Sequence, residues 1–331
     1  MPRETAHILW NTDAGSASMQ EELAARLSNE PHARVIHTAS LDEAIAATRE
    51  AVVHRIPRII AAGGDGTVNA VASTILDAGV NGSALGVLPL GTGNDLARSL
   101  GMSLNPLEAL AEVLDGEIVP IDVLSGTQGS ERRWVFNMAT AGNTGRFVES
   151  VTEEIKQRWG VLSYIRTGVQ AVRDLTVYDI EFDTDDGVRQ RVRALNVFLA
   201  NGRSSGGGVQ VAPTAKLDDG VFDYVIVLEG SAGELTSLVA DYAFDRLLEN
   251  NLILAGKASR MRMSAAPALK FSMDGDVVEG GDGEPVTFEL HRSLLPAIVG
   301  PAPLLNRSEL RSDEVPSLDN LIHAVPMLGV M

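Results

Sequence analysis

Apolar runs and helical patterns alternate along roughly the first 120 residues of the chain. Short apolar runs, which predict strands, occupy residues 7–10, 34–37, 59–62 and 84–88. The apolar positions between and after them take a helical period, which predicts helices over 18–28, 41–54, from 68, from 94 and near 106–114. This alternation indicates an α/β domain, a parallel sheet with helices on both faces.

Strand patterns and turn signals dominate after about residue 121. Strands are expected at 119–124, 133–138, 179–183, 188–200, 209–212, 222–228, 270–273 and 286–290, with helices near 149–172 and 232–249. We therefore predict an α/β domain over residues 1–122, a β-rich sandwich domain over 123–290 and a tail over 303–331. The chain is expected to return to the first domain at about 291–302.

Composition and charge narrow the classes of partner and compartment. A net charge of −17 argues against nucleic acid and against broad attraction to anionic membranes. No apolar run approaches the roughly 18–20 residues of a transmembrane segment, and the absence of cysteine favours a cytoplasmic setting. The six histidines form no pair with the spacing of a zinc site.

Two glycine-rich turns carry the chemistry. The first follows the apolar run 59–62 and reads Gly63, Gly64, Asp65, Gly66, Thr67, Val68, Asn69. The second follows the run 84–88 and reads Gly91, Thr92, Gly93, Asn94, Asp95. Both precede helices, so backbone N–H groups and positive helix ends would meet at the carboxyl edge of the sheet, where a phosphate binds well. Asp65 or Asp95 could hold Mg²⁺, a cation that prefers oxygen ligands.

Other phosphate-binding and hydrolytic motifs fit this chain poorly. No Walker A string occurs, no G-x-G-x-x-G follows either strand, and the protein-kinase signatures are missing. Residues 202–206 satisfy the G-x-S-x-G pattern of an esterase. They lead into a glycine turn and another strand, however, and not into the helix that a nucleophile elbow requires.

The paired turns resemble those of the diacylglycerol kinase catalytic family, which includes bacterial lipid kinases and sphingosine kinases and is distantly similar to NAD kinases. The resemblance runs from residue 8 to about 299, with further matches at 201–203, 206–208 and 212–220. It implies that ATP binds at Asn11, Thr38, Gly63, Gly64, Asp65, Gly66, Thr67, Asn69, Thr92, Asn94 and Asp95. It also implies a structural Mg²⁺ bound by the carboxylate of Asp219 and the backbone carbonyls of Lys216 and Val221.

The catalytic base is implied by position within the same resemblance. The family carries a glutamate in a D-G-E motif, and here the run 269–273 leads into Asp274, Gly275 and Asp276. We predict Asp276 as the base that accepts the proton of the acceptor hydroxyl. The alternative is Glu284, because residues 282–285 read D-G-E-P, although it would then sit in an enlarged hairpin loop.

These features predict an ATP-dependent lipid kinase that acts at the membrane surface, with diacylglycerol as the acceptor and phosphatidic acid as the product. A sphingoid-base kinase, an NAD kinase and a non-catalytic nucleotide-binding regulator are the alternatives. Residues 153–166 mix basic, aromatic and aliphatic side chains, and either touch a membrane interface or pack on the β-rich domain. A peripheral cytoplasmic enzyme is expected, with a homodimer as a further expectation.

Overall fold

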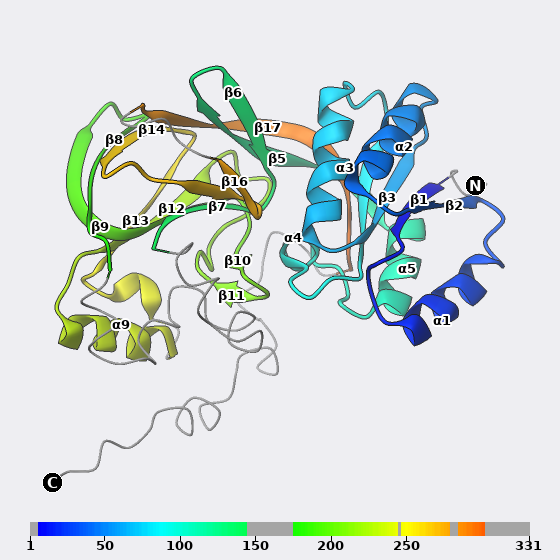
Figure 1. Ribbon diagram of the computed structural model, residues 1–331, viewed down its shortest axis with the longest axis horizontal. Helices are drawn as coiled ribbons and strands as arrows, with labels where there is room; N and C mark the ends of the chain where they lie inside the picture. The colour runs from blue at the N-terminus through cyan, green and yellow to red at the C-terminus, as the bar shows by residue number, and fades with distance from the viewer. Residues whose placement is uncertain (1–5, 144–174, 244–245, 279–283, 302–331) are drawn as a thin grey trace, which may run out of the picture.

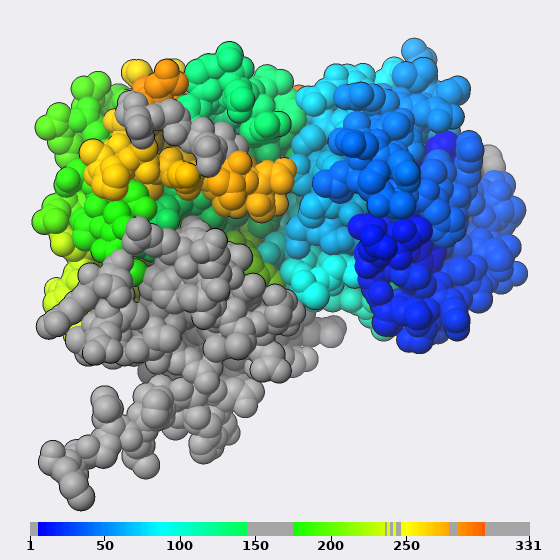
Figure 2. All heavy atoms as spheres, viewed as in Figure 1, coloured from blue at the N-terminus to red at the C-terminus, as the bar shows by residue number. Residues whose placement is uncertain are grey.

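The computed structural model describes residues 6–143, 175–243, 246–278 and 284–301 and has two domains side by side (Figure 1). The predicted helix at 149–172, the candidate membrane segment 153–166 and the tail 303–331 lie outside these described residues. The space-filling view shows the N-terminal domain, in blue and cyan, meeting the second domain, in green to orange, along a shared boundary (Figure 2).

The N-terminal domain is built on a parallel sheet in the order β2-β1-β3-β4. Its strands are β1 (Ala6–Asn11), β2 (Ala33–Thr38), β3 (Arg58–Gly63) and β4 (Ala84–Pro89). The helices are α1 (Ala17–Leu27), α2 (Leu41–Val53), α3 (Asp65–Asp77), α4 (Asp95–Ser99) and α5 (Pro106–Asp115). The predicted α/β class of this half is confirmed.

Local chemistry explains where these helices begin and how they cover the sheet. The side chains of Ser16, Ser40 and Asn105 accept N–H bonds at the starts of α1, α2 and α5, so each helix has a side-chain cap. Helix α2 packs on α3 and helix α1 on α5. Right-handed crossovers place α2 and α3 on one face of the sheet and α1 on the other.

The C-terminal domain is a β-rich sandwich, as predicted. Its strands are β5 (Glu117–Gln128), β6 (Glu131–Val135), β7 (Met138–Gly142), β8 (Tyr178–Thr184), β9 (Arg189–Ala200), β10 (Ser204–Ser205), β11 (Val209–Gln210), β12 (Phe222–Leu228), β13 (Ile253–Ala258), β14 (Arg260–Ala266), β15 (Phe271–Met273), β16 (Asp276–Val278) and β17 (Val286–Val299). Helix α9 (Ala232–Ala243) and a 3-10 helix at Leu247–Glu249 lie at one end of it. One apolar core gathers Phe182, Phe271 and Phe288, and a second gathers Phe198, Val225 and Leu238.

Strands β5 and β17 run through both domains as an antiparallel pair. Near its end β17 also pairs in parallel with β4, where Ala297 lies opposite Leu85. The sheet is therefore continuous from one domain to the other (Figure 1). The predicted domain boundaries at 122/123 and 290/291 fall inside these two strands and stay a prediction.

Three differences from the expected strands have physical causes. The strand expected at 133–138 is two strands, β6 and β7. The backbone leaves the strand conformation at Phe136 and Asn137, where its N–H groups donate to the carboxylate of Asp274. No strand was expected at the positions of β13 and β14. The alternation of arginine and methionine at 260–263 nevertheless matches a half-buried strand. Strand β17 continues past residue 290 because a bulge between His291 and Leu295 absorbs the break.

Candidate active site

The two glycine turns pack against each other at the carboxyl edge of the parallel sheet. Gly63 and Pro89 are paired at the ends of β3 and β4, and the Leu90 N–H donates to the carbonyl of Gly63 over 3.0 Å. A Cβ on Gly91 would lie 2.5 Å from the Cα of Gly64, so only glycine allows the two turns to come this close. Backbone from both turns thus lines one spot.

Asp65 joins the two turns through its carboxylate. Its two oxygens accept the backbone N–H groups of Asn94 and Asp95, each over 2.9 Å, at the start of α4. Asn94 itself has the left-handed φ of 54° and closes the second turn by two side-chain hydrogen bonds to Gly91. Burial raises the pKa of Asp65, and the charge of Asp95 adds to the rise, against the effect of these N–H donors.

Asp95 binds the N-terminal domain to a glycine-rich loop of the C-terminal domain. Its carboxylate accepts the hydroxyl of Ser204 over 3.0 Å and the backbone N–H groups of Gly207 and Gly208, each over 2.9 Å. The serine of the esterase-like pattern therefore donates to an aspartate. The esterase interpretation has no support in this geometry, because a nucleophilic serine needs an adjacent base such as histidine.

Helix α3 begins beside the turns without a side-chain cap. Its N-cap, Gly64, makes no side-chain capping bond, and Gly66 in the first turn is exposed. The first N–H groups of a helix of this length lack partners within the helix and attract anions. A phosphate group therefore fits this position.

The other residues predicted for the nucleotide lie at the same edge of the sheet. Asn11 and Thr38 are paired at the ends of β1 and β2, and the Asn11 side-chain amide lies 3.3 Å from the hydroxyl of Thr67. Thr38 is 2% exposed and donates its hydroxyl to the carbonyl of Trp10. Thr92, in contrast, is exposed in the second turn. The structure brings these positions together, and their role in binding ATP stays a prediction.

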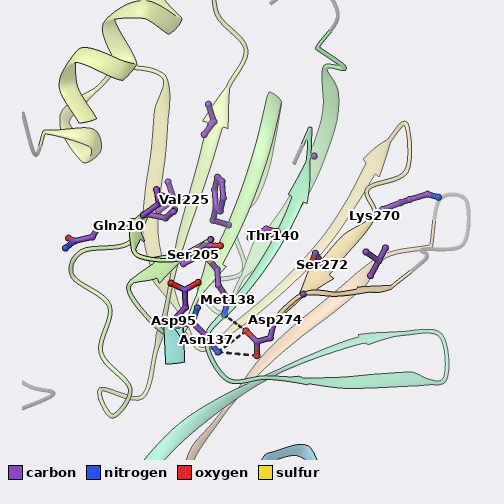
Figure 3. A pocket seen from close by; sticks show the side chains of 18 of the residues that line it. Asp95, Asn137, Met138, Thr140, Ser205, Gln210, Val225, Lys270, Ser272 and Asp274 are labelled. Atoms are coloured by element: carbon purple, nitrogen blue, oxygen red, sulfur yellow. Dashed lines mark hydrogen bonds between the residues drawn. The ribbon is translucent and has the colours of Figure 1, made fainter. Parts of the chain in front are cut away.

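Asp274 is a site residue that the sequence reasoning missed. It forms a two-residue turn with Gly275 between β15 and β16, and both residues have positive φ, 48° and 101°, as a type I′ turn requires. Its carboxylate accepts the backbone N–H groups of Phe136, Asn137 and Met138 at 2.6–3.1 Å (Figure 3). The side-chain amide of Asn69 in α3 donates to it over 3.4 Å.

The same surroundings make Asp274 titrate at an unusual pH. Burial raises its pKa to about 6, even though the three backbone donors favour the ionised form, and the charge of Asp65 adds to the rise. The titratable carboxylate of Asp274 thus links three parts of the structure: the β15–β16 turn, the β6–β7 connection and helix α3.

The two candidate bases lie in different places. Ser272 pairs with Val277 and Met273 pairs with Asp276, so Asp276 is on the hairpin face opposite to Ser272 and Val277, and its side chain is exposed. The carbonyl of Glu284 accepts the side chain of Gln128 at the end of the β5–β6 hairpin. These positions do not decide which of the two carboxylates is the base, and Asp276 stays the predicted base.

A cavity of about 1300 Å³ opens from the carboxylates into the C-terminal domain. Asp65, Asp95 and Asp274 are at one end of it. Many of its other lining residues are apolar or aromatic, among them Phe198, Val225, Val227, Leu238, Tyr242 and Ile253 of β9, β12, β13 and α9. Figure 3 shows Asp95, Asn137 and Asp274 grouped at this end, with Val225 and Thr140 farther along the strands. A large apolar pocket thus begins where the phosphate-binding turns end.

Comparison with known proteins assigns the chain to a family. Residues 5–125 match the model of the diacylglycerol kinase catalytic domain, and residues 138–299 match the YegS C-terminal NAD kinase beta sandwich-like domain. A probable lipid kinase YegS-like protein of Serratia proteamaculans is 31% identical over 251 residues, which cover 75% of this chain and 79% of that protein. The chain belongs to the diacylglycerol kinase family.

Other relatives agree with this assignment. A diacylglycerol kinase of Bacillus subtilis is 29% identical over 279 residues, covering 82% of this chain and 89% of the relative. A solved structure from Bacillus anthracis superposes with a TM-score of 0.75 at 24% identity, covering 91% of this chain and 97% of that one, and supports the fold. A second, described as a diacylglycerol kinase of the same organism, has a TM-score of 0.70 at 21% identity, covering 91% of this chain and 98% of that one.

Membership of the diacylglycerol kinase family confirms the resemblance drawn from the two glycine turns. It also makes the protein a phosphotransferase with an alcohol group as acceptor. None of the helices in the described part of the chain is both long and apolar enough to cross a membrane.

The structural Mg²⁺ that the diacylglycerol kinase family implies fits this chain poorly. One carboxylate oxygen of Asp219 lies 3.1 Å from the ammonium of Lys257, and the other accepts the N–H of Val221 over 3.3 Å. The metal at Lys216, Asp219 and Val221 stays a prediction, and no step of the reaction is built on it.

The side chain of Asn137 joins α4 of the N-terminal domain to the glycine-rich loop of the C-terminal domain. The Asn137 side chain accepts the hydroxyl of Ser99 in α4 over 3.0 Å and donates to the carbonyl of Ser204 over 2.7 Å. Both contacts join residues far apart in sequence, so no local pattern indicates them. For Asp274, the sequence does carry one local signal. Residues 274–275 read D-G, which is the strongest short-range indicator of a tight hairpin turn.

Proposed function

We propose that the protein transfers the γ-phosphate of ATP to the hydroxyl of a membrane lipid, with diacylglycerol as the acceptor and phosphatidic acid as the product. The observation that carries this proposal is the cavity of about 1300 Å³, which begins at Asp65, Asp95 and Asp274 and continues between apolar walls. Its volume exceeds the 300–1,000 Å³ of typical small-ligand pockets, so it has room for long hydrocarbon chains.

The nucleotide would bind at the two turns. The uncapped start of α3 and the glycine backbone suit its phosphates, with Asn11, Thr38 and Thr92 at the same edge. An accompanying Mg²⁺ would neutralise phosphate charge. Asp65 suits it better than Asp95, because Asp65 accepts two N–H bonds of the roughly four a carboxylate can accept, whereas Asp95 accepts three donors.

Asp276 is the proposed base. Asp65, Asp95 and Asp274 all accept backbone N–H donors, whereas no described residue donates to the Asp276 carboxylate. The acceptor hydroxyl would give its proton to this carboxylate while its oxygen bonds to the γ-phosphorus and the bond to ADP breaks. Because Asp276 lies on the hairpin face opposite to the cavity-lining Ser272 and Val277, the hydroxyl would meet its exposed side chain at the tip of the hairpin.

An acceptor panel tests the function. The full chain is incubated with γ-labelled ATP, Mg²⁺ and mixed micelles that contain diacylglycerol, a sphingoid base or no lipid, with NAD as a soluble acceptor. We expect label in phosphatidic acid alone. Label in NAD or in the sphingoid base would replace the proposed acceptor, and no transfer to any lipid would refute the lipid kinase.

Filling the cavity tests the place of the acyl chains. Val225→Trp adds bulk to a buried wall of the cavity, so we expect at least a tenfold rise in KM for a long-chain diacylglycerol and little change for a short-chain one or for ATP. Val188→Trp is the matched control, because Val188 is 54% exposed outside the cavity. Equal effects on long and short chains would place the chains elsewhere.

Replacing the candidate base tests the chemistry. Asp276→Asn should lower kcat by about 10²–10⁴ with little change in KM, the usual contribution of a general base. Glu284→Gln is the comparison, since its backbone is held at the β5–β6 hairpin. Normal activity of Asp276→Asn with loss in Glu284→Gln would reverse the assignment.

The proposed acceptor also sets where the protein works. A lipid hydroxyl is reached at a membrane surface, so we propose a cytoplasmic protein that binds there peripherally. The homodimer stays a prediction that sedimentation of the purified chain would test.

A further inference from the structure

The segment that joins β11 to β12 is fixed by a lysine. Lys257 on β13 lies directly opposite Asp223 on β12, and its ammonium is 2.9 Å from the Asp223 carboxylate. The same ammonium is 3.1 Å from Asp219 in the segment itself. One cation therefore joins two carboxylates that lie four positions apart in the chain.

The remaining carboxylate oxygens of this pair are also in use. The free oxygen of Asp223 accepts the hydroxyl of Thr214 over 2.7 Å, and that of Asp219 accepts the N–H of Val221. The Asp223 side chain is only 9% exposed, so its charge needs a partner more than a surface carboxylate would. The contacts thus close the segment from residue 214 to residue 223 around the Lys257 ammonium.

The segment matters because it lies against both domains. Leu217 is buried in the core of the N-terminal domain. The buried carboxylate of Asp122 accepts the N–H of Gly220 over 2.7 Å, and Arg292 of β17 donates to the Gly220 carbonyl over 3.2 Å. By fixing this segment, the Lys257 ammonium therefore also stabilises the wall of the cavity where the segment begins.

From these contacts we infer that the Lys257 ammonium does the work of a structural metal, so that residues 214–223 fold without a divalent cation. A metal bound at Asp219 would have to displace an ammonium that is already paired with two carboxylates.

Thermal unfolding of the full chain without nucleotide tests this inference. Wild type is unfolded in EDTA and in MgCl₂, with NaCl added to match the ionic strength. We expect the same Tm in both. A Tm that rises with MgCl₂ to saturation, and does not rise with NaCl, would show a bound divalent ion and overturn the inference.

Three variants test the lysine itself. Lys257→Gln should lower the Tm in EDTA by about 2–4 °C, the shift expected when a partly exposed ion pair is lost from a domain of this size. Lys257→Arg should stay near wild type because it keeps a cation. Lys216→Gln is the matched control, since Lys216 is in the same segment and forms no ion pair with a described residue.

Equal Tm values for Lys257→Gln and wild type, or equal losses in Lys257→Gln and Lys257→Arg, would refute the role of the ammonium. Because Tm is measured, failure of the kinase proposal would not affect the result.

Discussion

Asp274 should make the stability of the protein depend on pH between 5 and 8. Its pKa is about 6 in the folded protein against 3.8 for an ordinary aspartate, so the folded state binds this proton more tightly than the unfolded chain does. Stability contributed by this group therefore rises as the pH falls through 6. The full shift corresponds to about 3 kcal/mol, of which about half appears between pH 8 and pH 5.

Asp274→Asn isolates this contribution. The amide cannot ionise, so the variant lacks the gain at low pH, and its NH₂ group faces backbone N–H donors that have lost an acceptor. Leaving one or two buried N–H groups unsatisfied costs about 1–3 kcal/mol each, which offsets the removal of a buried charge at pH 8. The difference in unfolding free energy between wild type and variant should then widen by about 1 kcal/mol from pH 8 to pH 5.

Urea unfolding at pH 5, 6.5 and 8 measures this difference. Subtracting the variant from wild type removes the contributions of titrating groups that do not interact with Asp274, whereas the interaction with Asp65 is part of the measured difference. Asp276→Asn serves as the control, because it makes the same change at an exposed carboxylate two positions away. A constant difference between wild type and Asp274→Asn across the three pH values would refute the reasoning.

Two further substitutions test the contacts between the turns and between the domains. Gly93→Ala would place a Cβ 2.5 Å from a carboxylate oxygen of Asp65, so we expect at least a tenfold fall in kcat/KM for ATP, whereas Gly233→Ala, which meets no atom within 4 Å, should be silent. Ser204→Ala removes the hydroxyl bond to Asp95 and should lower the free energy of unfolding by about 1–2 kcal/mol in urea, with recovery in Ser204→Thr. Unchanged ATP kinetics in the first variant, or an equal loss with threonine in the second, would contradict these contacts.

The α/β half of the fold could be predicted because its signals are local. A helical period such as that of residues 68–76 and a side-chain cap such as Ser40 are readable within a few residues. The glycine turns were equally visible, and parallel strands bring their ends together at one edge of the sheet. The position of Asp65 and Asp95 at that edge follows from the same rule.

The polar contacts between the domains could not be predicted, because each joins residues far apart in sequence. Asp274 binds Phe136 across 138 positions, and Asp95 binds Gly208 across 113. A hydrophobic pattern says which face of a strand is buried, but not which backbone N–H groups another segment will satisfy. The same limit applies to Lys257, whose partners depend on the pairing of β12 with β13.

Strand β17 has a consequence for synthesis on the ribosome. Strands β1 to β4 emerge early, yet β4 is paired on its outer side by β17, which is made some two hundred residues later. Until then one edge of the parallel sheet is open to any passing strand. The N-terminal domain is therefore the first to start folding and among the last to finish, and a nascent chain cut short before residue 286 would lack the strand that seals both domains.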